Sequence, residues 1–182
     1  LALKKRWFRI DILGGEPTLY PYLPQLWSFL KLYKDKYPHC IVRFSTNGLK
    51  KYRAPQWVRV RNSVKQDRLQ DDHVAVNSAP CDNGEREIKC CTVPWRCGLA
   101  LTKYGYFLCG AGASIARVFG MDIGIKNLRD VNSEVMLAQM DRLCKYCGHS
   151  EVQSKHVPAE QETSSSWQKA IETYKDKKLS EY

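Results

Sequence analysis

The residues of this 182-residue chain best suited to chemistry are its cysteines, six of which follow residue 89. Cys144 and Cys147 form a C-x2-C turn that ends in glycine, and two thiolates at this spacing can chelate one metal centre. Cys97 and Cys109 flank a predicted hairpin with its turn at residues 103–105, which would bring them together at its open end. The two pairs together supply four thiolates, enough for one tetrahedral centre.

The spacing leaves both the ligand set and the metal open. Cys90 or Cys91 can replace one of the four cysteines, and His149 is a weaker spare ligand. Structural Zn²⁺ and an iron–sulfur cluster both accept four thiolates. A nucleophilic cysteine is the least favoured role, because no cysteine is paired with an obvious His and Asp or Asn arrangement.

A second candidate site follows the first predicted strand. Residues 8–13 show the period-two alternation of a strand, which stops abruptly at Gly14-Gly15-Glu16-Pro17. The two glycines permit backbone conformations and close approaches that a side chain would block, and Pro17 pushes Glu16 towards an extended conformation. Folds of the α/β class present ligand groups at such carboxyl ends of strands. The alternative is a strand-to-helix turn that binds nothing.

The elements around this turn form a parallel α/β unit. A helix is predicted over residues 22–36 from apolar residues at three- and four-residue spacing, with a buried strand over residues 40–44. Cys40, inside that strand, is predicted to be an inert core thiol. Further strands are expected at residues 57–64 and 73–76, and the short connections between them indicate that the usual helices are reduced.

The remaining chain is predicted to be small and mostly helical. Short helices are expected at residues 112–119 and from Asn132 or Ser133 to residue 143, then a linker and a helix over residues 167–178 capped by Ser166. That last helix docks on the core or binds a partner. We therefore expect three parts: a parallel α/β domain at residues 1–80, a cysteine-rich domain at 81–149, and a linker with a C-terminal helix at 150–182.

The composition favours a cytoplasmic protein without a membrane partner. Apolar residues make up 43% and charged residues 26% of the chain, and neither a long apolar stretch nor an export signal is evident. The cysteines are therefore expected to be reduced. The net charge of +10 is concentrated in the run at residues 50–68, which could bind RNA, although a solvated basic face is the commoner meaning of such a run.

The motifs at two strand ends resemble those of the radical S-adenosylmethionine enzymes. Gly14-Gly15-Glu16-Pro17 is similar to that family's GGEP motif, and Thr46-Asn47-Gly48 is similar to the TNG ending of its following strand. The resemblance covers roughly residues 5–149. It implies a (β/α) barrel that is truncated at its N-terminus, and a GGEP segment that contacts the amino group of the cofactor's methionine.

The resemblance also implies roles for other residues. Asn47, and more loosely Ser63 and Asn77, match strand-end positions that contact the cofactor. The pattern of Cys97, Gly105 and Cys109 is similar to the opening of the family's C-terminal SPASM or twitch domain. It implies one auxiliary [4Fe–4S] cluster on Cys97, Cys109, Cys144 and Cys147, in preference to Zn²⁺.

One family feature is absent from these residues. The C-x3-C-x2-C loop that holds the radical-generating cluster would lie upstream of Leu1. We therefore expect a truncated piece that is inactive by itself, with a degenerate relative as the alternative.

The leading hypothesis is thus a fragment of a radical S-adenosylmethionine enzyme with a peptide or small-molecule substrate and an external electron donor. The enzyme would cleave the cofactor reductively and abstract hydrogen from that substrate. The alternative is a non-catalytic, zinc-stabilised module that binds RNA through its basic face.

Overall fold

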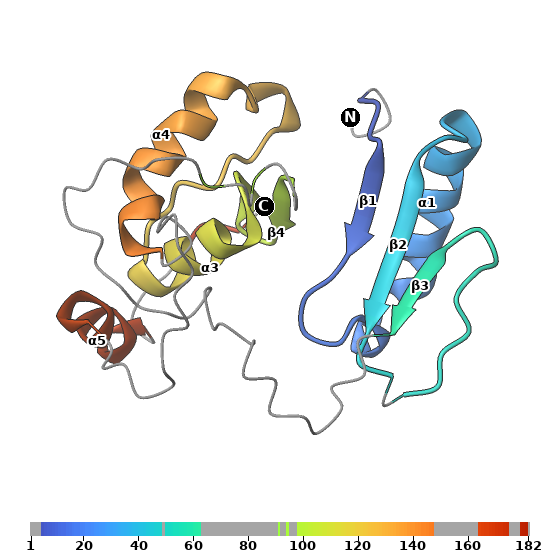
Figure 1. The fold of residues 1–182 in the computed structure, drawn as a ribbon, viewed down its shortest axis with the longest axis horizontal. Helices are drawn as coiled ribbons and strands as arrows, with labels where there is room; N and C mark the ends of the chain where they lie inside the picture. Colours follow the sequence, from blue (N-terminus) through green and yellow to red (C-terminus); the bar gives the residue numbers. More distant parts are fainter. Residues whose placement is uncertain are drawn as a thin grey trace. The chain divides into compact units, whose positions relative to one another are not determined.

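The computed structural model describes residues 5–48, 50–62, 91, 94, 98–147, 164–174 and 179–181. The chain divides into two compact units, Leu1–Leu69 and Gln70–Tyr182 (Figure 1). The boundary expected at residues 81–89, the strand expected at residues 73–76 and the linker after residue 150 lie outside the described residues.

Unit 1 is built on a three-stranded parallel sheet. Its strands are β1 (Arg9–Ile12), β2 (Ile41–Thr46) and β3 (Arg59–Asn62), which lie side by side in that order. A short 3₁₀ helix, η2 (Pro17–Leu19), and the helix α1 (Leu23–Lys36) connect β1 to β2. The predicted helix and the first two strands are confirmed. In the described part of unit 1 the sheet is open, and the partial, N-terminally truncated barrel remains an expectation.

The core of unit 1 lies between α1 and one face of this sheet (Figure 1). Val42 and Phe44 alternate along β2 with half-exposed residues, and both are almost fully buried. Trp27 of α1 packs edge-on against Phe44, with 5.3 Å between ring centroids. Burying each large apolar side chain of this kind stabilises the fold by about 1.5–3 kcal/mol. Because α1 buries one face in this way, its apolar residues recur with the 3.6-residue period that predicted the helix from the sequence.

The connection from β2 to β3 contains no helix in its described residues, 47–48 and 50–58. The Tyr52 hydroxyl accepts a hydrogen bond from Trp27 Nε1, and Val58 is buried in the same core. The reduced helix content expected here is therefore confirmed for these residues.

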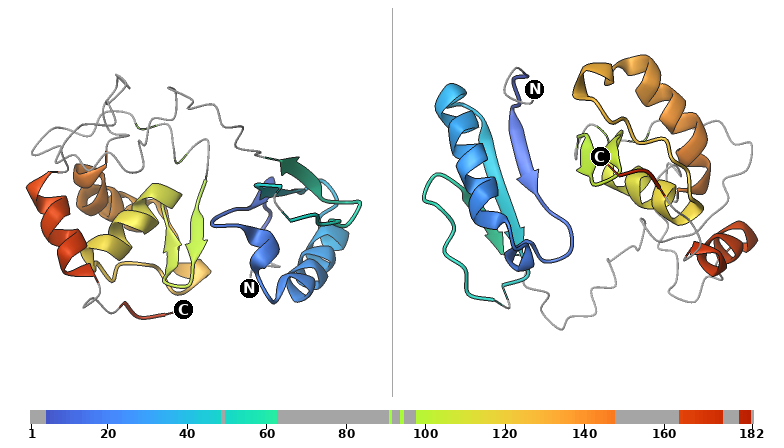
Figure 2. Two further views of the ribbon diagram at one scale, coloured as in Figure 1. Left: turned by 90° about the horizontal axis from the view of Figure 1, so that it is seen from below. Right: turned by 180° about the vertical axis from the view of Figure 1, so that it is seen from behind.

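Unit 2 combines a short hairpin with helices (Figure 2). Strands β4 (Ala100–Thr102) and β5 (Gly105–Phe107) pair antiparallel and lead into α3 (Gly110–Phe119). The 3₁₀ helix η3 (Leu128–Asp130) precedes α4 (Ser133–Leu143), and η4 (Cys144–Tyr146) follows it directly. The last helix is α5 (Ser165–Glu172). Asn132 caps α4 by accepting a hydrogen bond from Val135 N at 3.0 Å, as predicted.

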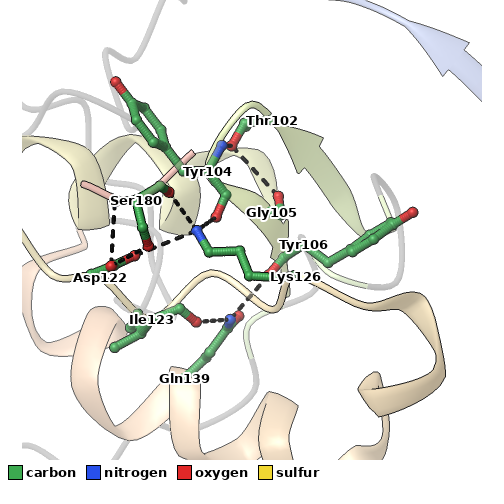
Figure 3. A network of polar contacts seen from close by, with 9 residues as sticks. All are labelled: Thr102, Tyr104, Gly105, Tyr106, Asp122, Ile123, Lys126, Gln139 and Ser180. Atoms are coloured by element: carbon green, nitrogen blue, oxygen red, sulfur yellow. Dashed lines mark hydrogen bonds and ion pairs between the residues drawn. The ribbon is translucent and has the colours of Figure 1, made fainter. Parts of the chain in front are cut away.

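Buried and half-buried polar groups tie the hairpin to the rest of unit 2 (Figure 3). Tyr106 exchanges two backbone hydrogen bonds with Ile125, of 2.8 and 3.1 Å. The buried Gln139 of α4 donates from Nε2 to Tyr106 O and Ile123 O, and its Oε1 accepts from Leu108 N at 2.9 Å. Both N–H groups and the oxygen of this amide are therefore paired, so Gln139 fixes α4 against the hairpin without an unsatisfied polar atom.

The C-terminal part of the chain docks within unit 2. Trp167 of α5 is buried, donates from Nε1 to Tyr146 O at 3.1 Å and meets Phe119 edge-on. Lys126 Nζ donates hydrogen bonds to both Ser180 O and Tyr104 O (Figure 3). These two bonds hold Ser180 beside the hairpin turn. The predicted cap at Ser166 is wrong, because α5 begins at Ser165 and Ser164 occupies the cap position without a side-chain capping bond.

No helix within the described ranges is long and apolar enough to cross a membrane.

Candidate functional site

Four thiols line one pocket of unit 2. Cys109, Cys144 and Cys147 are buried, Cys91 is half-buried, and none of the four is in a disulfide. The rest of the lining is mainly apolar and includes Leu108, Leu143, Met140 and Pro94. Thiols from three separate stretches of the sequence therefore converge in a pocket with little else that is polar.

Each of the three buried thiols is placed by the end of a helix. Cys109 is the N-cap of α3, and its sulfur accepts a hydrogen bond from Gly112 N at 3.3 Å. Cys144 ends α4, and the one-turn helix η4 carries the chain to Cys147, whose N–H donates to Cys144 O at 3.0 Å. A peptide N–H at the start of a helix stabilises negative charge on sulfur, as a metal-bound thiolate requires.

Burial and the charges of neighbouring groups disfavour the thiolate form of Cys144. Burial, and after it the negative charge of Cys147, Cys109, Cys91 and Asp141, raises the pKa of Cys144 to about 12. A bound cation would supply the positive charge that this cluster of sulfurs lacks.

The chemistry of the donors fits a thiolate-bound metal centre, and the size of the pocket bears on which one. Four thiolates satisfy either a tetrahedral Zn²⁺ or a [4Fe–4S] cluster. The cavity is about 10 Å³, near the minimum that holds one water molecule, so a cluster would require the thiols to move apart. Within the described residues, no group of three or more His, Cys, Asp or Glu side chains is arranged closely enough to hold a metal ion.

Four of the six candidate metal ligands come together in this pocket. Cys109, Cys144 and Cys147 share the pocket with Cys91, which the sequence offered as a substitute ligand. Cys97, Cys90 and His149 lie outside the described residues. Cys40 is a buried core thiol in unit 1, and burial raises its pKa, as expected for an unreactive cysteine.

The second candidate site lies at the carboxyl edge of the parallel sheet. Glu16 links the two strand ends there: its Oε1 accepts hydrogen bonds from Thr18 N, Thr18 Oγ1 and Thr46 Oγ1 at 3.0, 2.7 and 2.7 Å. Its Oε2 accepts from Asn47 N at 2.7 Å. Sequence reasoning missed Thr18 and Thr46 as partners, although a threonine two residues after the carboxylate and another at the next strand end were available signals.

These hydrogen bonds stabilise the ionised form of Glu16. The bond from the Asn47 backbone is the largest cause, and with the threonine donors it lowers the pKa of Glu16 to about 2. The carboxylate is thus held charged and fixed, with Oε1 engaged by three donors and Oε2 by one. Oε2 keeps most of its capacity to accept further hydrogen bonds.

The glycines at this turn serve backbone conformation. Gly14 and Gly15 have φ of +92° and +48°, values that favour glycine. A Cβ built on either would have no neighbour within 4 Å, so the close packing expected here is not found among the described atoms. Pro17 begins η2 and is buried. Ser63 and Asn77, the other proposed cofactor contacts, lie outside the described residues.

Comparison with known proteins gives no further assignment: no family model, curated protein or solved structure matches the chain.

Proposed function

We propose that this chain is part of a radical S-adenosylmethionine enzyme. In this proposal the turn at Gly14–Pro17, with Asn47, binds the amino end of the cofactor, and the thiol pocket of unit 2 holds an auxiliary [4Fe–4S] cluster. The complete enzyme would cleave the cofactor reductively and abstract hydrogen from a peptide or small molecule, with electrons from an external donor.

The observation that carries the proposal is the convergence of Cys91, Cys109, Cys144 and Cys147 on one pocket. The sequence offered these residues as metal ligands from their spacing, and four thiols that converge on one pocket, three of them buried, have few other uses in a reduced protein. The [4Fe–4S] assignment, in preference to Zn²⁺, rests on the resemblance of the GGEP and TNG strand ends.

The geometry of the first site also supports the proposal. The Glu16 carboxylate is fixed and charged beside the backbone of two parallel strand ends, where α/β folds bind ligands. A carboxylate with spare acceptor capacity is a suitable partner for the ammonium group of a methionine.

Metal reconstitution tests the proposal. The full chain is reconstituted anaerobically with iron and sulfide, or separately with Zn²⁺, and the bound metal is measured together with the visible charge-transfer absorption of an iron–sulfur cluster. One cluster per chain is expected, and a Cys109→Ala and Cys147→Ala double variant should lose it. Cys40→Ala, which removes a buried thiol from the other unit, is the matched control and should keep it. Stoichiometric zinc with no iron would refute the cluster assignment.

A further inference from the structure

The sheet of unit 1 has a second face, opposite the one that α1 covers, and this face is rich in arginine. The register places Arg9, Asp11 and Arg43 on it from β1 and β2, and Arg59 and Arg61 from β3. Val42 and Phe44, which point into the core beneath α1, alternate with these residues along the strands. We call this set of four arginines and one aspartate the arginine face.

Asp11 neutralises the part of the arginine face that lies nearest β1. Arg43 binds it in a bidentate manner, with Nε–Oδ1 and Nη2–Oδ2 distances of 2.5 and 2.8 Å, and Arg9 Nε lies 2.8 Å from Oδ2. Burial acts to raise the pKa of Asp11, but the hydrogen bonds and charges of Arg43 and Arg9 outweigh it and lower the pKa. One carboxylate thus orients two guanidinium groups.

The part of the arginine face on β3 is not neutralised in this way. Arg59 is the direct cross-strand neighbour of Arg43, and Arg61 is the neighbour of Ser45, one pleat nearer the carboxyl edge. Both side chains are exposed, and among the described residues neither has an acidic partner. Asp11 compensates the charge of Arg43, so Arg59 and Arg61 are the cations of the arginine face that remain exposed to an external anion.

We propose that the arginine face binds an anionic group of the substrate, a phosphate or a carboxylate, through Arg59 and Arg61 with Arg43 beside them. Guanidinium groups match both anions by paired N–H donors, and two arginines of alternate strand positions can hold one ligand together. That the anion belongs to the substrate rests on the proposed function, since the face leads to the carboxyl edge where Glu16 lies. The binding site itself does not rest on it.

The test uses the full chain and two probes, pyrophosphate and glutarate, titrated calorimetrically at constant ionic strength. An Arg59→Gln and Arg61→Gln double variant is compared with Lys31→Gln and Lys36→Gln, which removes the same charge from exposed positions on α1. We expect one probe to bind saturably, with the arginine variant at least about tenfold weaker and the lysine variant unchanged. The stronger probe identifies the anion as phosphate or carboxylate. Circular dichroism of both variants checks that the fold is retained.

Several results would overturn this inference. Equal weakening by the lysine variant would mean that only net charge matters, and absence of saturable binding by either probe would remove the site. Displacement of the bound probe by S-adenosylmethionine would assign the face to the cofactor. Binding of a single-stranded RNA in place of both probes, with a steep salt dependence lost in the arginine variant, would make it a nucleic-acid surface.

Failure of the chain to take up iron or S-adenosylmethionine while the anion still binds would refute the proposed function alone.

Discussion

At the scale of single residues, Glu16 shows how one side chain can organise the edge of a parallel sheet. Its carboxylate joins the turn after β1 to Thr46 and Asn47 at the end of β2. These hydrogen bonds reach their full strength only when the carboxylate is charged. The stability of unit 1 should therefore depend on the ionisation of Glu16.

Replacing Glu16 by Gln should destabilise unit 1 at pH 7, because the neutral amide accepts fewer and weaker hydrogen bonds. The pKa of Glu16 is lowered from 4.5 to about 2, so its contribution is complete above about pH 4.5 and is lost as the pH falls towards 2. The difference in stability between wild type and variant should therefore shrink across that window. Hydrogen exchange of peptides from β1 and β2, measured between pH 7 and 2.5 and corrected for the intrinsic exchange rate, checks this.

Glu134→Gln is the control for that experiment, because Glu134 lies exposed in the first turn of α4 in the other unit. It should leave the exchange of β1 and β2 unchanged at every pH. A Glu16 variant whose effect stayed constant from pH 7 to 2.5 would show that shape, and not charge, is what the turn requires.

The residues of the two sites differ in how far the sequence revealed them. The need for glycine at positions 14 and 15 and the grouping of Cys109, Cys144 and Cys147 followed from local spacing and turn chemistry. The partners of Glu16 and the ion pairs of Asp11 depend on strand register across about thirty residues of sequence, as their separations show. Periodicity gives the strands but not which side chains meet across them.

At the scale of elements, the hairpin β4–β5 depends on a close backbone approach. Gly105 has a φ of +108°, and a Cβ at this position would lie 2.6 Å from Ile125 O. Gly105→Ala should therefore destabilise unit 2 by about 2–4 kcal/mol, combining backbone strain with a steric clash that forces the two segments apart. Hydrogen exchange of the peptide that spans residues 100–107, measured at increasing urea concentrations, gives this loss of stability.

Gly98→Ala separates the two causes. Gly98 has a φ of +73°, but a Cβ there would have no neighbour within 4 Å, so only the backbone strain of about 1–2 kcal/mol is expected. Equal effects of the two substitutions would contradict the steric explanation for Gly105.

The hairpin and the helices were predictable because their signals are local. The cap of α4 and the hairpin turn were placed correctly from caps, glycines and apolar spacing. The start of α5 was not, because Ser164, Ser165 and Ser166 are equivalent as capping residues and Trp167 packing decides where the helix begins. Gln139 reads as an ordinary helix residue in the sequence, and its three-way hydrogen bonding appears only once β5 and α4 are packed together.

At the scale of the whole molecule, the described residues form two separate cores, one in each unit. One core lies between α1 and the parallel sheet, and the other surrounds the thiol pocket. Cys109, Cys144, Cys147 and Trp167 belong to the same buried cluster, so α5, which is distant in the sequence, stabilises the part of the molecule that carries the thiols. We expect its removal to affect the pocket before any other part of the chain.

Trp167 gives the sharpest test of that dependence, because its Nε1 donates to the carbonyl of Tyr146, between Cys144 and Cys147. Phe119 of α3 stacks on Tyr146, with 4.1 Å between ring centroids, and meets Trp167 edge-on at 5.0 Å. The three rings thus form an aromatic cluster that connects α5 to the C-x2-C turn. Trp167→Phe keeps most of the packing and loses the hydrogen bond, which should cost about 1 kcal/mol. If the turn opens by local unfolding, the pocket thiols should then react about fivefold faster with a thiol reagent.

The control for this prediction is Ile171→Ala, which removes an exposed side chain from the same helix. It should leave the rate of thiol modification unchanged, and Trp167→Ala, which also loses the aromatic contact, should increase the rate further than Trp167→Phe does. The readout needs no metal, so it holds whether the pocket takes iron–sulfur, zinc or neither. If all three variants reacted at the wild-type rate, α5 would be attached to unit 2 without stabilising its thiols, and the site would depend on α3 and α4 alone.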